Sequence, residues 1–118
     1  MGAYFKKYFK DLNEKINDIE RDKLVKFSLL IKSLIETNRK CIFVGNGGSA
    51  SIASHVTVDL IKAANIKAIN FNEANFLTCY ANDFGYENWI KEALKSYANE
   101  GDLLILISSS GESKNIIN

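Results

Sequence analysis

The stretch from Cys41 to Ala50 constrains the fold of this chain more than any other part of the sequence. The apolar run Cys-Ile-Phe-Val meets a glycine cluster at 45–48, and a helical pattern of small residues begins directly after it and continues to Lys62. This change of pattern predicts a strand, a tight turn and a helix in immediate succession. A chain built on such connections folds as an α/β protein with a parallel sheet.

The glycine turn suits an anion, above all a phosphate. Glycine permits positive φ angles and lets backbone N–H groups approach a ligand without an intervening Cβ. The helix that follows adds further donors and the positive end of its dipole. The alternative is a tight strand–helix connection without a ligand. The turn contains neither a Gly-Lys-Ser/Thr sequence nor the G-x-G-x-x-G spacing, so no nucleotide cofactor is predicted.

A second loop of the same kind follows a later strand. Residues 102–107 read as a strand buried on both faces, and the next residues, at 108–113, are Ser-Ser-Ser-Gly-Glu-Ser. Serine hydroxyls donate and accept hydrogen bonds from a short stem, which suits phosphate oxygens. The alternative is an ordinary helix cap, although one serine would suffice for that. Both loops leave the carboxyl ends of strands, where open α/β sheets bind ligands, so we expect one shared anion pocket.

Composition fits one small domain in the cytoplasm. The chain has 118 residues, 47% of them apolar, and 15 basic against 14 acidic residues, which gives a net charge of +1 and predicts no nucleic-acid partner. No apolar run approaches the roughly 20 residues of a membrane span, and no signal peptide is evident, so no membrane partner is expected. Cys41 and Cys79 read as reduced core thiols.

The remaining pattern predicts two amphipathic helices ahead of the first strand, within residues 4–37. Their apolar stripe is larger than a small sheet needs, so we expect it to pack on another subunit, although it could be ordinary core. The other predicted elements are strands at 41–45, 66–71 and 102–107 and helices at 49–63, 73–81 and 86–98. The chain stops at Asn118, early in a further helix, and we interpret it as the N-terminal portion of a longer domain.

Two pairs of polar residues could carry chemistry. His55 and Asp59 share a face of the helix after the glycine turn, because they are four residues apart. They could hold a divalent metal or place a carboxylate base beside the ligand, or they could be a surface pair. Asn82 and Asp83 lie in a predicted loop before Gly85, where they could bind a sugar hydroxyl or form an Asx turn.

These motifs, taken in order, resemble the sugar isomerase (SIS) domain. The matching segments are Gly-Asn-Gly-Gly-Ser at 45–49 with His55 after it, Asn-Asp-Phe-Gly at 82–85, and the serine loop at 108–113. Within that family the chain is most similar to the phosphoheptose isomerase branch. The resemblance covers residues 4–118. It implies a flavodoxin-like parallel sheet flanked by helices, preceded by two N-terminal helices (residues 1–37) through which such proteins assemble as homo-oligomers, usually tetramers.

The resemblance also implies roles for individual residues. Asn46, Gly47, Gly48 and Ser49 would line the sugar, and Asn82 and Asp83 would bind its hydroxyls. The phosphate would be held by Ser108, Ser109, Ser110 and Ser113. The histidine matching His55 is a zinc ligand in that branch, and the residue at the position of Asp59 is both a metal ligand and the catalytic base.

The chain departs from the branch at several positions. The branch has glutamate at the position of Asp59 and usually threonine at that of Ser109, and its remaining functional glutamine and histidine would lie beyond Asn118. The function that the resemblance predicts is aldose–ketose isomerisation of a sugar phosphate, namely a heptose phosphate, through an enediol. Because of these departures, we do not expect this chain to turn over alone. The alternative is a SIS module that binds a sugar phosphate or docks a protein without catalysis.

Overall fold

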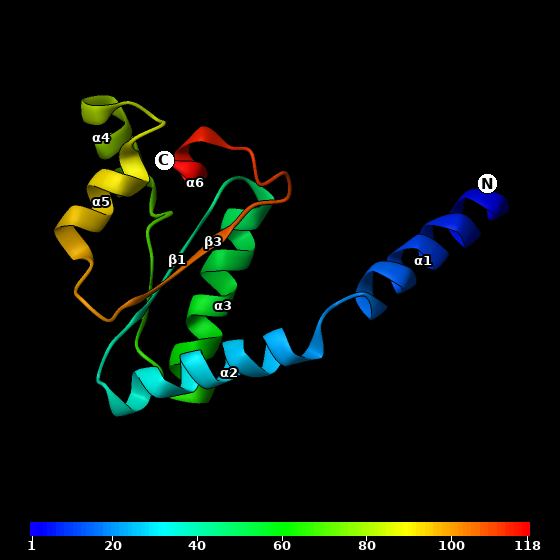
Figure 1. The fold of residues 1–118 in the computed structure, drawn as a ribbon. Coiled ribbons are helices and arrows are strands. Elements are labelled where there is room, and N and C mark those ends of the chain that lie inside the picture. The colour runs from blue at the N-terminus through cyan, green and yellow to red at the C-terminus, as the bar shows by residue number, and fades with distance from the viewer. The chain divides into compact units, whose positions relative to one another are not determined.

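The computed structural model describes residues 1–118, which divide into two compact units, Met1–Leu30 and Ile31–Asn118. The boundary between the units falls within the second helix. The elements, labelled in Figure 1, are α1 (Gly2–Asn17), α2 (Arg21–Glu36), β1 (Cys41–Gly45), α3 (Gly48–Ala64), β2 (Ala68–Asn70), α4 (Ala74–Phe84), α5 (Trp89–Tyr97), β3 (Leu103–Ile107) and α6 (Lys114–Ile117). No helix is both long enough and apolar enough to cross a membrane.

The first unit consists of α1 and the beginning of α2. Helix α1 contains no buried residue. Its large apolar side chains recur at helical spacing, as the sequence predicted, and remain exposed; they are Tyr4, Phe5, Tyr8, Phe9, Leu12 and Ile16. The two predicted helices are therefore confirmed. The apolar stripe of α1 is not part of a core within this chain, whereas Leu34 near the end of α2 is.

The second unit is built on a parallel sheet with the strand order β2-β1-β3. Strand β1 is central, and all of its residues are buried. Its register runs from Cys41 opposite Leu103 to Gly45 opposite Ile107. The sheet confirms the predicted α/β class, and this order is the one with which a flavodoxin-like sheet begins.

Helices cover the sheet on two sides, because successive residues of β1 point to opposite faces. Cys41 and Phe43 pack with Ala53 of α3 and with Leu34 near the end of α2. Ile42 and Val44 pack on the other face with Trp89 and Ile90 of α5, and α4 contributes partly buried side chains there. The central strand thus holds a helix layer on each side, as its uninterrupted apolar sequence predicted.

Strand β3 differs from its prediction as a strand buried on both faces. Its residues alternate in burial, and Leu104 and Leu106 are each 37% exposed. These two leucines line an apolar groove of about 410 Å³ together with α5 and α6. The prediction holds for the face where Leu103, Ile105 and Ile107 pack against the core, and it was wrong for the other face, where α5 and α6 leave Leu104 and Leu106 partly uncovered.

The two cysteines also differ from each other. Cys41 is buried in β1, as predicted, and burial raises the pKa of its thiol to about 12, which leaves it unreactive. Cys79 is exposed on α4, where its Sγ lies 3.8 Å from Asp83 Oδ2. The prediction of a core thiol was therefore wrong for Cys79, because the apolar face of α4 is formed by other residues, notably Phe76, Leu77 and Tyr80.

An ion pair joins the residues that precede β1 and β3, at the amino-terminal ends of these two strands. Lys40 Nζ lies 2.5 Å from Asp102 Oδ2, and the Asp102 side chain is only 5% exposed. The carboxylate also accepts hydrogen bonds from the backbone N–H groups of Lys40 and Asn99. Burial raises the pKa of Asp102, but the hydrogen bonds from Lys40 and these backbone groups outweigh it and lower the pKa overall.

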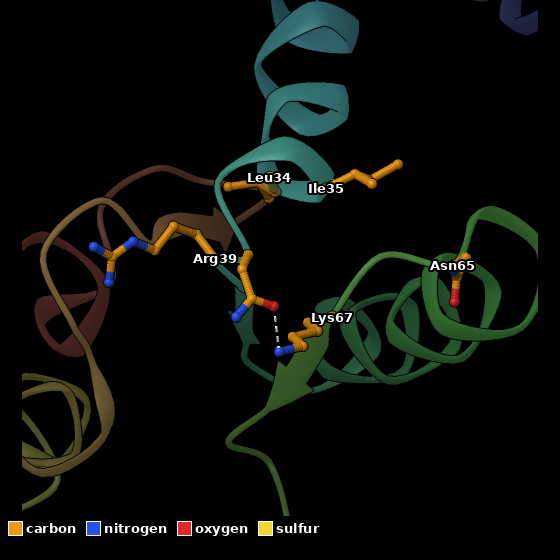
Figure 2. A pocket seen from close by; sticks show the side chains of 6 residues that line it. Leu34, Ile35, Arg39, Asn65 and Lys67 are labelled. Atoms are coloured by element: carbon orange, nitrogen blue, oxygen red, sulfur yellow. Dashed lines mark hydrogen bonds between the residues drawn. The ribbon is translucent and has the colours of Figure 1, made fainter.

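A cavity of about 210 Å³ lies beside the starts of β1 and β2 and is lined by Leu34, Ile35, Asn38, Arg39, Asn65 and Lys67 (Figure 2). Helices α2 and α3 end here, with Asn38 and Asn65 at positive φ. Lys67 Nζ donates to Asn38 Oδ1 at 2.6 Å. The Arg39 side chain points away from Lys67 in Figure 2, so the two cations do not converge. Because helix C-termini attract positive charge, these basic side chains suit the helix ends at this edge.

Candidate phosphosugar site

The glycine and serine loops leave neighbouring strands at the same edge of the sheet. Gly45 ends β1 opposite Ile107, which ends β3, and the two strands are parallel. Asn46 and Ser108, the next residue along each strand, therefore begin their loops side by side. The prediction that both loops share one edge is confirmed.

The glycine loop is a sharp connection from β1 to α3. Gly47 has φ 53° and ψ −122°, a conformation that suits glycine, and it occupies the N-cap position of α3. No side chain caps this helix, but the Ser49 and Ala50 N–H groups donate to the Asn46 and Gly47 carbonyls at 3.0 Å each, which leaves the Gly48 N–H at the start of the helix for an anion. A Cβ on Gly45 would lie 2.6 Å from the backbone carbon of Ser49, which requires glycine at the end of β1. The helix begins at Gly48, one residue earlier than predicted.

Asn72 fixes the end of β1. Its Oδ1 accepts from the Gly45 N–H at 3.1 Å, and its Nδ2 donates to the Gly45 carbonyl at 2.7 Å. The side chain thus replaces a strand partner just beyond β2, whose pairing with β1 ends at Asn70. The Asn72 N–H in turn donates to Asn70 Oδ1 at 2.7 Å. The sequence reasoning missed Asn72, which has no spacing signal.

The serine loop carries its hydroxyls close to the chain surface. Ser108 Oγ accepts from the Gly111 N–H at 3.0 Å, and Ser110 Oγ accepts from the Glu112 N–H at 3.2 Å. Ser109 and Ser110 are exposed, while Ser108 and Ser113 are half-buried. Ser113 occupies the N-cap position of α6, but its hydroxyl makes no capping bond. The hydroxyls are therefore not consumed in capping the helix.

Asn46 is held from two other segments. Asn46 Nδ2 donates to Asn115 Oδ1 at 2.9 Å, and Asn115 Nδ2 donates back to Asn46 Oδ1 at 2.9 Å. The Tyr86 hydroxyl donates to Asn46 Oδ1 at 3.0 Å. Asn115 is 4% exposed. The sequence reasoning missed the roles of Asn115 and Tyr86; the only available signal was a polar residue beside the apolar pair Ile116 and Ile117.

Asn82 and Asp83 do not lie in a loop. Helix α4 continues to Phe84 and places both residues in its last turn, where they are exposed. Asn82 Nδ2 donates to Asp83 Oδ1 at 2.9 Å. The loop and Asx-turn predictions were wrong because the helix stops only at Gly85, whose φ of 83° and N–H bond to the Ala81 carbonyl end it. Glycine at 85 was the signal that marks this end.

His55 and Asp59 form a pair on α3. His55 Nε2 lies 3.5 Å from Asp59 Oδ2, and the two side chains are 81% and 60% exposed. The shared helix face is confirmed, but within the single chain neither side chain is enclosed. The chain contains no group of three or more His, Cys, Asp or Glu side chains placed to hold a metal. A catalytic zinc needs three protein ligands, so this chain alone does not fit such a site.

The SIS domain family matches residues 4–118, a range that includes both loops and the leading helices. The chain belongs to this family. The phosphoheptose isomerase of Sulfurimonas denitrificans is 34% identical over 128 aligned residues, which cover 96% of this chain and 66% of that protein. The phosphoheptose isomerase of Glaesserella parasuis is 35% identical over 91% of this chain and 59% of its own length.

Solved structures agree with the sequence comparison. A phosphoheptose isomerase from Francisella tularensis has a TM-score of 0.85 and 25% sequence identity, covering 98% of this chain and 63% of its own. The enzyme from Neisseria gonorrhoeae has a TM-score of 0.83 and 26% identity, covering 98% and 62%. The SIS fold family is therefore shown, within the phosphoheptose isomerase branch, and the chain spans less than two thirds of the length of these relatives.

Proposed function

We propose that this chain binds a sugar phosphate between its glycine and serine loops and contributes that half-site to an aldose–ketose isomerase acting on a heptose phosphate. The observation that carries the proposal is the parallel register of β1 and β3, which brings both loops to one edge. The Gly48 N–H at the start of α3 and the serine hydroxyls, none of which caps α6, supply donors for an anion. The similarity to phosphoheptose isomerases supports the choice of substrate.

In this proposal the phosphate is held by Ser108, Ser109, Ser110 and Ser113, and the sugar lies along residues 46–49. Phosphate binding is remote from the reacting carbons, so its binding energy positions them for reaction. Asn82 and Asp83, in the last turn of α4, would contact sugar hydroxyls. The Tyr86 bond to Asn46 supports this assignment, because it brings the segment after α4 against the glycine loop.

The chemical step would be a proton transfer between adjacent carbons. Asp59 would remove the proton from the carbon next to the carbonyl, and the carbonyl oxygen would take a proton from water, which gives the enediol. The neighbouring hydroxyl would then lose its proton to water as Asp59 returns its own proton to the former carbonyl carbon, so that a carbonyl forms at the adjacent carbon. The carboxylate is regenerated, so the step is balanced without an oxidant. His55 and Asp59 would be two of the ligands if zinc is bound, with further ligands from outside the residues of this chain.

We also propose that the chain forms a homo-oligomer through the first unit. Its support is the exposed apolar stripe of α1, since soluble proteins rarely leave patches of such size uncovered. Sedimentation velocity should show a dimer or tetramer at micromolar concentration. A stable monomer would contradict this part of the proposal.

The second candidate function is binding without catalysis. It is favoured by Asp59, one methylene shorter than the glutamate of the branch, and by the exposure of the His55–Asp59 pair. A displacement of about 1 Å at a catalytic group can cost on the order of a hundredfold in rate.

Calorimetric titration with sedoheptulose 7-phosphate, run beside an isomerisation assay, tests both candidates. If the chain is catalytic, Asp59→Asn should abolish turnover and leave the Kd within about twofold, because the amide keeps the shape but cannot accept the proton. Glu100→Gln is the control, because this exposed carboxylate precedes β3 at the end opposite the serine loop, and it should retain turnover. Binding without turnover, in a protein that also carries the C-terminal part of the SIS domain, would support the second candidate, and no binding would reject both.

A further inference from the structure

We propose that Asn115 is a positioning residue, which locks the Asn46 carboxamide and thereby ties the glycine loop to the segment that carries the serine loop. The inference rests on the proposed function, because it assigns a use to the edge where the sugar phosphate would bind. Asn115 follows Ser113 by two residues, so the element that begins at the phosphate loop also holds the residue that would face the sugar.

The contact is a closed pair of carboxamides. Each side chain donates one hydrogen bond to the other, both at 2.9 Å, and Asn115 is 4% exposed. A buried amide is costly unless it is hydrogen-bonded, and here the partner is the other loop. Because the residues are 69 positions apart in the chain, the pair is a tertiary link and not a local turn.

The hydrogen-bonding capacity of Asn46 is nearly used up. A carboxamide offers two donor and two acceptor positions. The pair with Asn115 uses one of each, and the Tyr86 hydroxyl uses a third position. A single position remains for a ligand, on a group that cannot rotate without breaking its bonds to the protein. The remaining position is one Nδ2 N–H, so Asn46 is fixed in advance to donate a single hydrogen bond to a ligand oxygen, which in the proposed function belongs to the sugar.

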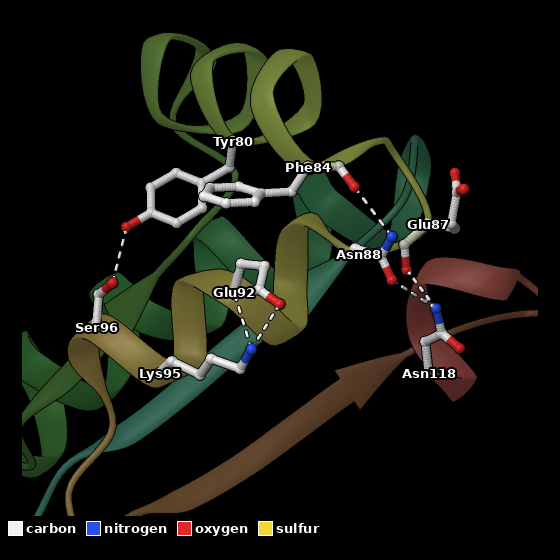
Figure 3. Close-up of polar contacts among 8 residues, drawn as sticks. All are labelled: Tyr80, Phe84, Glu87, Asn88, Glu92, Lys95, Ser96 and Asn118. Atoms are coloured by element: carbon white, nitrogen blue, oxygen red, sulfur yellow. Dashed lines mark hydrogen bonds and ion pairs between the residues drawn. The ribbon is translucent and has the colours of Figure 1, made fainter.

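Helix α6 does not depend on Asn115 for its place. Asn118 Nδ2 donates to the Glu87 carbonyl at 3.0 Å and to Asn88 Oδ1 at 3.1 Å, and Asn88 Nδ2 donates to the Phe84 carbonyl at 2.9 Å (Figure 3). Ile116 packs against the core cluster on the same side of the sheet. A change at Asn115 can thus release Asn46 while α6 stays anchored, so positioning and folding can be tested separately.

The test compares Asn115→Ala with Asn118→Ala, which removes the other side-chain anchor of α6 without touching Asn46. Two probes are titrated by calorimetry: sedoheptulose 7-phosphate and inorganic phosphate. Asn115→Ala should raise the Kd for the sugar phosphate about tenfold, since Asn46 loses its fixed orientation, and leave the Kd for inorganic phosphate within about twofold. Asn118→Ala should change neither Kd by more than about twofold.

The side-chain amide resonances of Asn46 give an independent readout by ¹⁵N-edited NMR. They should shift in Asn115→Ala and in Tyr86→Phe, and stay in place in Asn118→Ala. The positioning role would be overturned if Asn115→Ala lost equal affinity for both probes, or if the two alanine variants changed the Kd values equally. Either result would leave the proposed function intact. If the parent binds neither probe, the proposed function fails and this role fails with it.

Discussion

The glycine loop and the serine loop leave adjacent strands at the same edge of the sheet, but they are held very differently. The glycine loop is fixed by Asn72 on the backbone of Gly45 and by Asn115 and Tyr86 on the side chain of Asn46. The serine loop is held within itself, by the bonds from Gly111 and Glu112 to serine hydroxyls. The glycine loop is thus hydrogen-bonded to other segments of the chain, whereas the bonds of the serine loop lie within the loop.

Under the proposed function, this difference would divide the roles between the two loops. A loop that is fixed before the ligand arrives loses little conformational freedom on binding and can set the orientation of the sugar. A loop of exposed hydroxyls can adjust around a phosphate, whose oxygens accept hydrogen bonds from many directions. Substitutions that disturb the fixed glycine loop should therefore lower the free energy of unfolding, whereas those in the serine loop should lower affinity with little effect on stability.

The largest effect should come from Gly45→Ala. The new Cβ would lie 2.6 Å from the Ser49 backbone carbon and 2.7 Å from its carbonyl oxygen, so the start of α3 must move away from β1. We expect a loss of about 3 kcal/mol or more in the free energy of unfolding, measured by urea denaturation. Gly48→Ala is the control, because a Cβ there meets nothing within 4 Å. Equal losses in the two variants would contradict the close-approach explanation.

The next largest loss of stability should come from Asp102→Asn. Asp102 precedes β3, at the opposite end of this strand from the serine loop. Loss of the charge leaves Lys40 unpaired and should cost about 2 kcal/mol of unfolding free energy. The pKa of Asp102 is lowered in the folded chain, so its contribution is present above the unfolded-state pKa of about 3.9 and is lost as the pH falls through the lower folded value. The stability difference between parent and variant should be full near pH 6 and shrink below about pH 4. A pH-independent difference would exclude this charge effect.

A smaller loss is expected for Asn72→Ala. It removes two hydrogen bonds from the backbone of Gly45 and should lower the free energy of unfolding by about 1 to 2 kcal/mol. Thermal unfolding followed by circular dichroism would measure this. Asn75→Ala is the matched control on the exposed surface of α4 and should stay within about 0.5 kcal/mol. An unchanged Asn72→Ala variant would show that the glycine loop is no better anchored than the serine loop.

The smallest effect on stability should come from Ser110→Ala. The side chain is exposed and its hydroxyl accepts only one local bond, so unfolding should change by less than about 0.5 kcal/mol. Affinity for sedoheptulose 7-phosphate should fall about fivefold by calorimetry, because one phosphate donor is lost. Ser54→Ala, an exposed serine on α3, should leave both quantities unchanged. Stability lost in place of affinity would contradict the division of roles between the loops.

The amino-acid sequence determined the elements that local physics controls. The apolar run at 41–44 and the glycines after it specified a buried central strand and a tight turn, because few other structures accommodate that pattern. The amphipathic spacing at the start of the chain specified two helices. The two loops could be placed at one edge in advance, because parallel strands direct their carboxyl ends the same way.

Only the tertiary structure decided which polar groups complete the site. Three sets of hydrogen bonds join residues far apart in the chain, and no sequence periodicity signals them. They are the bonds between Asn46 and Asn115, the bond from Tyr86 to Asn46, and those from Asn72 to the backbone of Gly45. It also decided that β3 is an edge strand and that α4 extends through Asn82 and Asp83 to Gly85. The physical reason is that local sequence sets backbone preference, whereas a hydrogen bond between distant side chains exists only once packing has brought its donor and acceptor together.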